Sequence, residues 1–398
     1  MRYLVVVPGG YWQQSLIQEA KNQGFTVIVV DSNPNALGFH IADHQIVAEL
    51  EDFEGISNEI RLITNTIVGA VSFCSDVGVE LSFYLNQLFQ VQSQQFLEPI
   101  NFVSKSQQRK NWAHAKILQP NFKCFDNFEL AIRHCRSATL PMVVKPVDSS
   151  GSRGVTILSE TQDFQQALID AFNFSRTNQV IVEEFMFGVE FTVEVFAFDG
   201  EILPVLITQK EKIQNATGTV SGFLRAIDPD CSMYSQIANL AAQAYSALGL
   251  RNGPGHLELI VDLESGPVGV VEAAARGGGF GLSTKLMYEV TGFDLIDETL
   301  KVLNGNCKMP KALKFKPGAL FFFPSRKGRL VRIEGLAESR AIEGVDISVL
   351  ATIGSYYQDP TTDADRLCAI VVTASSTEEL DNRIQLIRER LRFVFDDK

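Results

Sequence analysis

The 398-residue sequence lacks the features that mark several large classes of protein. No apolar run approaches the roughly 20 residues that a transmembrane helix needs, so we expect no membrane partner. The six cysteines include no CxxC pair and no dense framework, which indicates reduced thiols and a cytoplasmic protein. Acidic residues outnumber basic ones by 47 to 35, and the net charge of −12 argues against nucleic acid as a main partner.

Two common nucleotide-binding motifs are also missing. The first turn reads PGGYWQ, which is not G-x-G-x-x-G, so we predict no dinucleotide site there. The loop of small residues at 148–154 is not a Walker A motif, because its lysine, Lys145, stands before the loop. The N-terminal MRYLVVVPGG has no A-x-A-like cleavage site, and we expect a first β-strand there rather than a signal peptide.

What the sequence does contain is an alternation of strand and helix patterns. Residues 1–95 alternate continuous β-branched runs with helical stretches, as expected for a small doubly wound unit on a parallel sheet. Residues 96–312 combine a basic helix, a lysine-ended strand, a DG hairpin signal and the loop RGGGFG. Residues 313–398 contain further strands and a helix that begins with the capping signal STEE. We therefore predict an α/β (mixed α+β) fold in three domains.

The stretch VVKPVDSSGSRG, residues 143–154, places a cation at the mouth of a loop of small residues. Gly151 and Gly154 permit positive φ angles, and successive N–H groups in such a loop can form a nest for an anion. Lys145 would add positive charge for a phosphate chain. A glycine-bearing hairpin with a surface lysine explains this stretch equally well when it is taken alone.

Two carboxylates occur inside apolar, strand-like stretches, Glu258 in HLELI and Glu272 in VVEAAAR. Burying a carboxylate without a partner is costly. Two carboxylates on one face of adjacent antiparallel strands would form a hard-oxygen site for Mg²⁺ held against phosphates. Two unrelated surface positions are the alternative, and strand alternation that places Leu257 and Leu259 on the face opposite Glu258 is compatible with it.

A third stretch, VIVEEFMFGVEF, ends an apolar strand in an acidic and aromatic run. The backbone of a strand end can read an adenine edge, Phe185 or Met186 can pack on the ring, and Glu190 can take ribose hydroxyls. An acidic strand end with a core aromatic is the alternative, and this stretch alone favours it.

In this order and spacing, the fragments resemble the ATP-grasp superfamily of ligases over nearly the whole chain. The resemblance implies a Rossmann-like pre-ATP-grasp domain at 1–95, an ATP-grasp domain at 96–312 with a lid at about 121–184, and a small C-terminal domain at 313–398. It implies that ATP and Mg²⁺ are the cofactors, with Mn²⁺ as a possible substitute for Mg²⁺. It also implies that Glu258 and Glu272 are the metal ligands. The nucleotide-binding positions that it implies are Lys105, Lys145, Ser150, Gly151, Ser152, Gly154, Glu183, Glu184, Phe185, Met186 and Glu190.

Within the superfamily, the sequence looks most like carboxylate–amine ligases that resemble bacterial L-amino-acid ligases. The second metal strand reads EAAAR, with Ala274 where most ATP-grasp enzymes carry the asparagine of Glu-x-Asn, so a third protein ligand is in question. The resemblance implies that a carboxylate attacks the γ-phosphate of ATP and that an amine then displaces phosphate from the acylphosphate. Lys145 and Arg276 are the implied catalytic residues. Arg276 would hold the substrate carboxylate or the tetrahedral oxyanion, or else form a structural ion pair with Glu272.

Several points stay open at this stage. His256, Lys210 and Lys212 could face the same pocket, or could pack and face solvent as such residues more often do. A carboxylase or carbamoyl-phosphate-type enzyme on the same scaffold and a non-catalytic nucleotide-binding module are the alternative functions. Small-molecule carboxylate and amine substrates are the expected partners, and a homodimer is left open.

Overall fold

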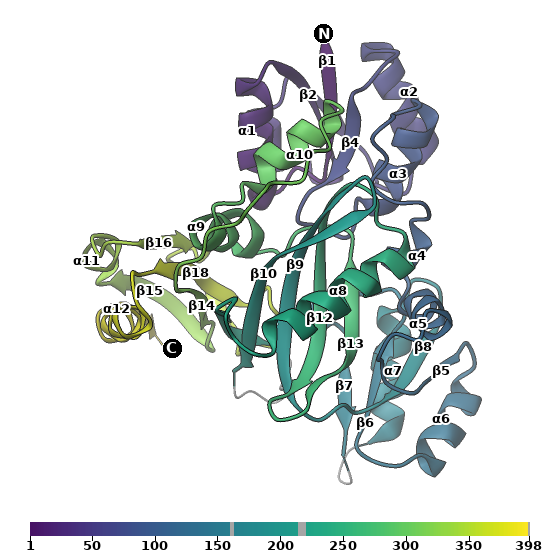
Figure 1. Ribbon diagram of the computed structural model, residues 1–398, viewed down its shortest axis with the longest axis vertical. Helices are drawn as coiled ribbons and strands as arrows, with labels where there is room; N and C mark the ends of the chain where they lie inside the picture. Colours follow the sequence, from purple (N-terminus) through teal and green to yellow (C-terminus); the bar gives the residue numbers. More distant parts are fainter. Residues whose placement is uncertain (160–162, 214–219, 397–398) are drawn as a thin grey trace.

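Four β-sheets organise the part of the chain that the computed structural model describes, residues 1–159, 163–213 and 220–396 (Figure 1). The mixed α/β class predicted from the sequence is confirmed. The expected lid at 121–184 and the third domain at 313–398 include residues 160–162 and 397–398, which lie outside the described residues. No helix of the described residues combines the length and apolarity that crossing a membrane requires.

The N-terminal sheet is parallel, with strand order β3-β2-β1-β4. Alternate residues of β1 enter two separate cores, Leu4 and Val6 on one face and Val5 and Val7 on the other. Both faces are covered, which explains the continuous apolar runs. The strands are β1 (Arg2–Val7), β2 (Phe25–Asp31), β3 (His44–Val47) and β4 (Gly69–Ser72). The helices are η1 (Tyr11–Gln13), α1 (Gln14–Asn22), η2 (Leu37–His40), α2 (Phe53–Ile63) and α3 (Val79–Leu88).

An eight-stranded sheet forms the centre of the molecule, in the order β13-β12-β9-β10-β11-β14-β18-β16, with antiparallel neighbours throughout. Helix α8 lies across one face (Figure 1), and Leu257 and Leu259 of β12 are fully buried in the same core as α8. The strands are β9 (Val189–Phe198), β10 (Glu201–Lys212), β11 (Ser221–Ala226), β12 (Gly253–Asp262), β13 (Gly266–Ala274), β14 (Gly318–Pro324), β16 (Val345–Val349) and β18 (Arg366–Thr373). The helix is α8 (Tyr234–Leu248).

The central sheet crosses the expected boundary at 312/313, because β14 pairs with β11. Helix α10 likewise returns to the N-terminal sheet and packs beside α1 (Figure 1). The proposed domain boundaries stay predictions. The connecting helices are α4 (Ile100–Val103), α5 (Lys105–His114), the π-helical turn η3 (Leu282–Leu286), α9 (Met287–Thr291) and α10 (Leu295–Leu303).

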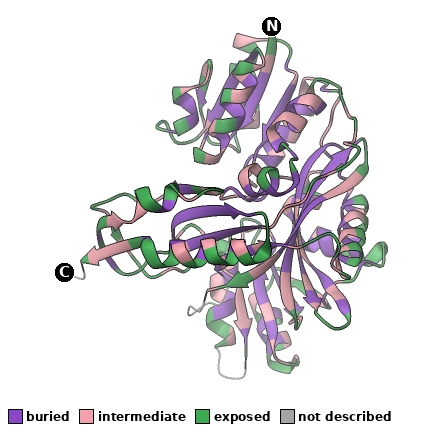
Figure 2. Cartoon of the chain, turned by 60° about the vertical axis from the view of Figure 1, so that its left-hand side comes forward, coloured by how far each residue is buried: buried purple, intermediate pink, exposed green. Residues whose placement is uncertain are grey.

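A smaller sheet, in the order β5-β8-β6-β7, carries the loop of small residues between β6 and β7. Helices α6 and α7 share a hydrophobic core with it. Strands β6 and β8 of this sheet are largely buried, whereas β5 and β7 are partly exposed; across the molecule, the helices keep exposed stripes (Figure 2). The elements are β5 (Phe122–Phe125), α6 (Phe128–Ser137), β6 (Met142–Pro146), β7 (Thr156–Leu158), α7 (Phe164–Phe174) and β8 (Val180–Glu184).

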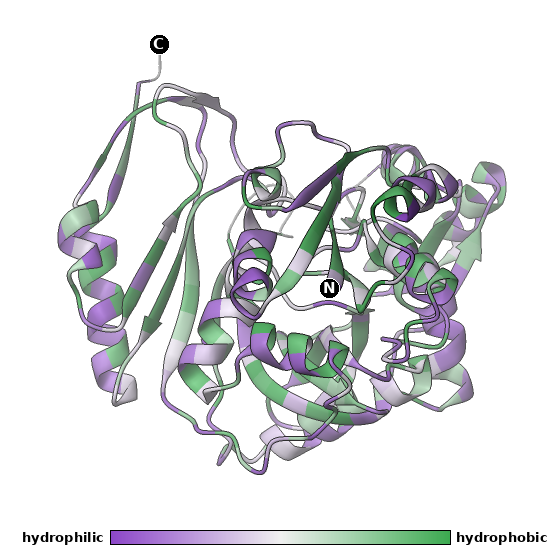
Figure 3. Cartoon of the chain, turned by 90° about the horizontal axis from the view of Figure 1, so that it is seen from above, coloured by the Kyte–Doolittle hydropathy of each residue, from purple (hydrophilic) through white to green (hydrophobic). Residues whose placement is uncertain are grey.

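The C-terminal part adds a three-stranded sheet and a helix against the far end of the central sheet. Ser376 caps this helix by accepting a hydrogen bond from Glu379 N, as the sequence predicts. Figure 3 shows apolar and polar residues alternating along the helices that cover the sheets. The elements are β15 (Gly328–Glu334), α11 (Leu336–Arg340), β17 (Tyr356–Tyr357), α12 (Thr377–Arg390) and β19 (Arg392–Asp396).

Candidate active site

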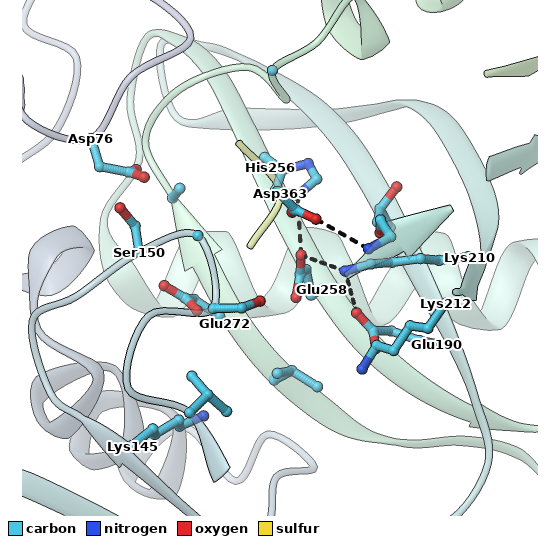
Figure 4. A pocket seen from close by; sticks show the side chains of 18 of the residues that line it. Asp76, Lys145, Ser150, Glu190, Lys210, Lys212, His256, Glu258, Glu272 and Asp363 are labelled. Carbon is cyan, nitrogen blue, oxygen red and sulfur yellow. Dashed lines mark hydrogen bonds and ion pairs between the residues drawn. The ribbon is translucent and has the colours of Figure 1, made fainter. Parts of the chain in front are cut away.

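A cavity of about 430 Å³ lies where the N-terminal sheet, the small sheet, the central sheet and the C-terminal part meet (Figure 4). Residues from all four regions line it. The predicted positions found in its wall are Lys105, Lys145, Ser150, Gly151, Ser152, Glu183, Glu184, Phe185, Met186, Glu190, Glu258, Glu272 and Arg276.

Gly154 is the one predicted position that does not line this cavity. It has a positive φ of 71°, and a Cβ there would lie 3.0 Å from the Phe174 ring of α7. Gly154 therefore allows the loop to turn and to pack closely on α7. Contact between Gly154 and a nucleotide stays a prediction.

Lys145 stands at the centre of a buried cluster of charges. Its Nζ lies 2.7 Å from Glu183 Oε2, and Arg109 Nε lies 2.7 Å from Glu183 Oε1. Burial opposes the ionisation of Glu183, but the charges of Arg109 and Lys145 outweigh it and lower the pKa of Glu183 to about 2. Burial lowers the pKa of Lys145, and Glu183 partly offsets this. The Glu183 side chain, expected beside the adenine, is thus committed to holding Lys145.

Lys105 joins one of the predicted metal carboxylates to the loop of small residues. Its Nζ lies 2.8 Å from Glu272 Oε1 and donates a 2.5 Å hydrogen bond to Ser149 O. Ser104 caps α5 by accepting from Gln107 N, which places Lys105 at the first position of the helix. Lys105 and Lys145 therefore enter the cavity from two elements next to the loop.

Glu258 and Glu272 face each other across the β12–β13 ladder, where they are direct partners in the register. Both line the cavity (Figure 4). Leu257 and Leu259 take the opposite face, so the alternation has its predicted direction. Burial raises the pKa of Glu258, but Lys210 and His256 hold it well below its usual range. The two facing carboxylates are hard-oxygen donors that fit a divalent cation.

No third carboxylate, imidazole or thiol group joins Glu258 and Glu272 in a metal-binding arrangement among the described residues. Within residues 1–159, 163–213 and 220–396, no group of three or more His, Cys, Asp or Glu side chains is arranged to hold a metal ion. Ala274 lines the cavity on β13, opposite His256, and its methyl group offers no donor atom. Any remaining ligands of a bound cation would have to come from water or from phosphate.

Lys210 and Lys212, whose positions the sequence left open, both line the cavity. Lys210 Nζ pairs with Glu190 and lies 2.9 Å from Glu258 Oε1, while Lys212 Nζ lies 2.6 Å from Glu190 Oε2 (Figure 4). Burial lowers the pKa of Lys210, but the Glu190 and Glu258 charges outweigh this and raise it. Glu190, expected at the ribose, is therefore held between two lysines.

His256 also belongs to the cavity wall, and Glu194, which the sequence analysis missed, holds it in place. Glu194 contacts His256 Nδ1, accepts from Gly278 N at 2.9 Å, and accepts from the Ser283 hydroxyl. Burial opposes protonation of His256, but Glu194 and Glu258 raise its pKa to about 9. The imidazole is thus a cation at neutral pH, with Nε2 3.6 Å from Glu258 Oε1.

Arg276 does not pair with Glu272. Its Nε and Nη2 each donate a 2.9 Å hydrogen bond to the two oxygens of Asp76, in the segment after β4 of the N-terminal sheet. Burial raises the pKa of Asp76, but Arg276 outweighs this and lowers it. This bidentate pair ties the loop after β13 to the N-terminal sheet. Glu183–Arg109 and Asp76–Arg276, like Glu194–His256, are pairs that sequence reasoning missed.

Comparison with known proteins adds two family matches. Residues 138–284 match the ATP-grasp domain, and residues 320–396 match the L-amino acid ligase C-terminal domain 2. The first match contains strands β6, β7 and β8 of the small sheet, the loop and both facing carboxylates. The second match contains the C-terminal side of the cavity.

Similarity to individual proteins is more distant. The chain is 29% identical over 125 residues to a phosphoribosylamine–glycine ligase of Lactococcus lactis, which covers 31% of this chain and 30% of that relative. It is 23% identical over 394 residues to a formate-dependent phosphoribosylglycinamide formyltransferase of Prochlorococcus marinus, covering 95% of this chain and 93% of that one. The structure of an L-amino acid ligase from Bacillus licheniformis superposes with a TM-score of 0.84 at 18% identity, covering 100% of this chain and 99% of that one. The chain thus spans about 30% of the length of the glycine ligase and shares its fold with the L-amino acid ligase.

Proposed function

Because this chain belongs to the ATP-grasp superfamily and carries an L-amino acid ligase C-terminal domain, we propose that it is an ATP-dependent carboxylate–amine ligase. It would activate a carboxylate as an acylphosphate, release ADP, and then form an amide or peptide bond with release of phosphate. Small-molecule carboxylates and amines would be its substrates.

One observation carries this proposal: two lysines and two facing carboxylates converge in one cavity beside a loop of small residues. Lys105 contacts both Glu272 and the loop carbonyl of Ser149. Such a set suits phosphoryl transfer, which depends mostly on positioning and on neutralising negative charge.

The nucleotide positions follow from the same wall. Met186 and Phe185 at the end of β8, with Val143 and Ile157 of the small sheet, give an apolar lining for an adenine ring. The loop 148–154 would cover the phosphates, and Gly151 and Ser152 have the positive φ angles, 65° and 61°, of a turning backbone. Glu258 and Glu272 would hold Mg²⁺, which supplies charge neutralisation to the phosphates when bound.

The proposed reaction has two steps that these residues can serve. A carboxylate oxygen forms a bond to the γ-phosphorus while the bond to the β,γ-bridging oxygen breaks, and Lys105 and Lys145 balance the charge that reaches ADP. The neutral amine nitrogen then bonds to the acyl carbon, the carbon–oxygen bond to phosphate breaks, and the leaving phosphate takes up the proton that the nitrogen loses. Cover by the loop would keep water from hydrolysing the acylphosphate. The positive His256 and Arg276 lie in the same wall and would stabilise the tetrahedral oxyanion.

We also propose domain limits at 1–95, 96–312 and 313–398 and a cytoplasmic location. All six cysteines are free thiols in the structure, which suits a reducing compartment.

The test is a screen of amino acids and small acids, singly and in pairs, for ATP-dependent phosphate release, with mass spectrometry of the product. The proposal predicts ADP, phosphate and an amide that forms only when both substrates are present. Glu272→Gln is the inactive reference. AMP and pyrophosphate as products would overturn the ligase mechanism, and ADP release that depends on bicarbonate without an amine would favour the carboxylase alternative.

A further inference from the structure

The C-terminal part contributes one buried cation to the cavity, Arg366, at the start of β18. Its residue exposure is 6%, yet it lines the cavity wall. Nη2 donates to Ser221 O at 3.0 Å and pairs with Asp363 Oδ1 at 2.6 Å. Asp363 Oδ1 in turn accepts from Ser221 N at 3.0 Å, so these three residues tie the C-terminal part to β11 of the central sheet. This anchor fixes where the guanidinium stands.

Two aromatic rings fix how the guanidinium is oriented. Arg366 Cζ lies 3.7 Å from the centre of the Phe322 ring and 4.5 Å from that of Phe280. Phe280 itself packs edge-on against Trp12 of the N-terminal part, with ring centres 5.5 Å apart. Cations over aromatic faces are attracted to the ring electrons, and the packing also removes the rotational freedom of the side chain. Arg366 is therefore held in one geometry before any ligand binds.

Phe280 occupies a strained backbone position. Its φ is 56°, in the left-handed region that a bulky side chain rarely adopts. Such strain is unfavourable and concentrates at ligand sites, where the surrounding structure maintains it. Here Trp12, Phe322 and Arg366 surround the ring, so the N-terminal part, the central sheet and the C-terminal part meet at this one side chain. The strain and the clamp are two independent signs that this end of the cavity is built for recognition.

Arg366 also retains a hydrogen-bond donor that the protein does not use. Its Nε is buried and has no hydrogen-bond partner among the described residues. A buried donor without a partner costs free energy, and a ligand acceptor would remove that cost. Arg276, by contrast, already gives its Nε and Nη2 to Asp76. Of these two arginines in the wall, Arg366 is the one with Nε still available.

We propose that Arg366, held between Phe280 and Phe322, binds the carboxylate of the amine substrate. This carboxylate is distinct from the one that is phosphorylated. This inference rests on the proposed ligase function and deepens it. The carboxylate to be activated must lie at the γ-phosphate, beside the lysines and the metal carboxylates. Arg366 enters from a different part of the chain and would bind the second carboxylate, which sets the position of the amine.

The cavity wall next to Arg366 is apolar and indicates the kind of side chain that the amine substrate carries. Leu224, Leu282 and Leu320 line the cavity and belong to the same hydrophobic cluster as Phe322. Phe280 packs against this cluster. An amine substrate with a carboxylate and an apolar side chain would pair its charge with Arg366 and bury its side chain against these residues.

The experiment compares amino acids that have apolar side chains with their carboxamides, which keep the amine and side chain but lack the charge. For wild type we expect the amino acid to show a KM about 10- to 100-fold lower than its carboxamide, the range for losing a hydrogen bond to a charged group. Arg366→Gln should raise KM for the amino acid by a similar factor and leave KM for the carboxamide nearly unchanged. A mutant that keeps the wild-type preference would overturn the proposal. Arg366→Gln is also compared on acid substrates with and without a second carboxylate. If the variant raises KM only for acids that carry a second carboxylate, Arg366 binds the acid substrate and the assignment to the amine substrate is wrong.

Direct binding of the same compounds, measured by calorimetry without turnover, separates this inference from the ligase function. If the protein forms no amide but binds the amino acid more tightly than its carboxamide, and this preference depends on Arg366, the subsite is supported and the ligase function is rejected. If the protein is an active ligase without this preference, only the subsite is rejected. If Arg366→Gln is unstable because Asp363 loses its partner, the double variant Arg366→Gln/Asp363→Asn removes that unpaired carboxylate. Arg225→Gln is the matched control, because Arg225 also sits over a ring, Phe223 at 5.4 Å, and pairs with Asp381, but lies outside the cavity. It should leave both preferences unchanged.

Discussion

The Nζ atom of Lys145 lies 2.7 Å from Oε2 of Glu183, and both side chains are almost completely buried. Arg109 holds the second oxygen of the same carboxylate. One glutamate thus neutralises two buried cations, and it keeps Lys145 in the wall of the cavity. The pair therefore serves the stability of the fold and the geometry of the site together.

Replacing Glu183 with glutamine should destabilise the protein strongly, because two buried cations would lose their counter-charge. We expect a loss of about 3–5 kcal/mol in the free energy of unfolding, measured by chemical denaturation. Glu184→Gln is the control, since Glu184 follows in the same strand but is exposed and accepts a hydrogen bond from Asn121. The control should change by less than about 0.5 kcal/mol. Similar losses in both variants would show that the buried cluster is not special.

The facing carboxylates yield a prediction about metal. Glu258→Gln and Glu272→Gln should each lower turnover by at least about 10²-fold at saturating Mg²⁺ while circular dichroism shows that the protein is still folded. Glu264→Gln, in the exposed turn between the same two strands, is the control and should keep full activity. Near-normal turnover in either cavity variant would remove that residue from the metal site.

Ala274 gives a complementary prediction. It stands on the strand of Glu272 where a third ligand could be placed, and it lines the cavity with a methyl group. If two carboxylates suffice, Ala274→Asn should leave turnover and the Mg²⁺ concentration for half-maximal activity nearly unchanged. A large gain in activity would mean that the natural site is short of a ligand.

Sequence patterns predicted the parts of this site that depend on the alternation of side chains along a single strand. Alternation in HLELI placed Glu258 opposite Leu257 and Leu259, and the antiparallel pairing then brought Glu272 to the same face. The parallel N-terminal sheet followed in the same way from continuous apolar runs. These features need only the direction of neighbouring strands, which a short stretch of sequence determines.

The partners in the long-range ion pairs could not be predicted. Asp76 and Arg276 are 200 positions apart and meet only after the N-terminal sheet packs against the central one. Arg109 lies on a helix with no apolar stripe, and its burial comes from tertiary contacts with Glu183 and the β13 backbone. Arg366 reaches the cavity because the central sheet continues through β14 and β18 across an expected domain boundary. No local sequence pattern encodes these long-range contacts.

The Asp76–Arg276 pair supports a prediction about coupling. Arg276→Lys cannot keep both hydrogen bonds, so turnover should fall on the order of 10²-fold with little change in melting temperature. Asp76→Asn should lower turnover too, because the guanidinium would lose its fixed orientation. If Arg276 acts through this pair, the double variant should be no worse than the poorer single variant. Additive losses would show that the two residues act independently.

A final prediction concerns pH. Burial opposes protonation of His256, but the Glu194 and Glu258 carboxylates raise its pKa from the ordinary 6.5 to about 9. The folded protein therefore binds this proton more tightly than the unfolded chain does, and the resulting stability is fully present below about pH 6.5 and lost as the pH rises through about 9. The free energy of unfolding of wild type minus that of His256→Gln should thus shrink by up to about 3 kcal/mol over this window. Denaturation series from about pH 6 to about pH 10 measure the difference, and taking the difference cancels the groups common to both proteins. A flat difference for His256→Gln would mean that the imidazole is not held as a cation by Glu194.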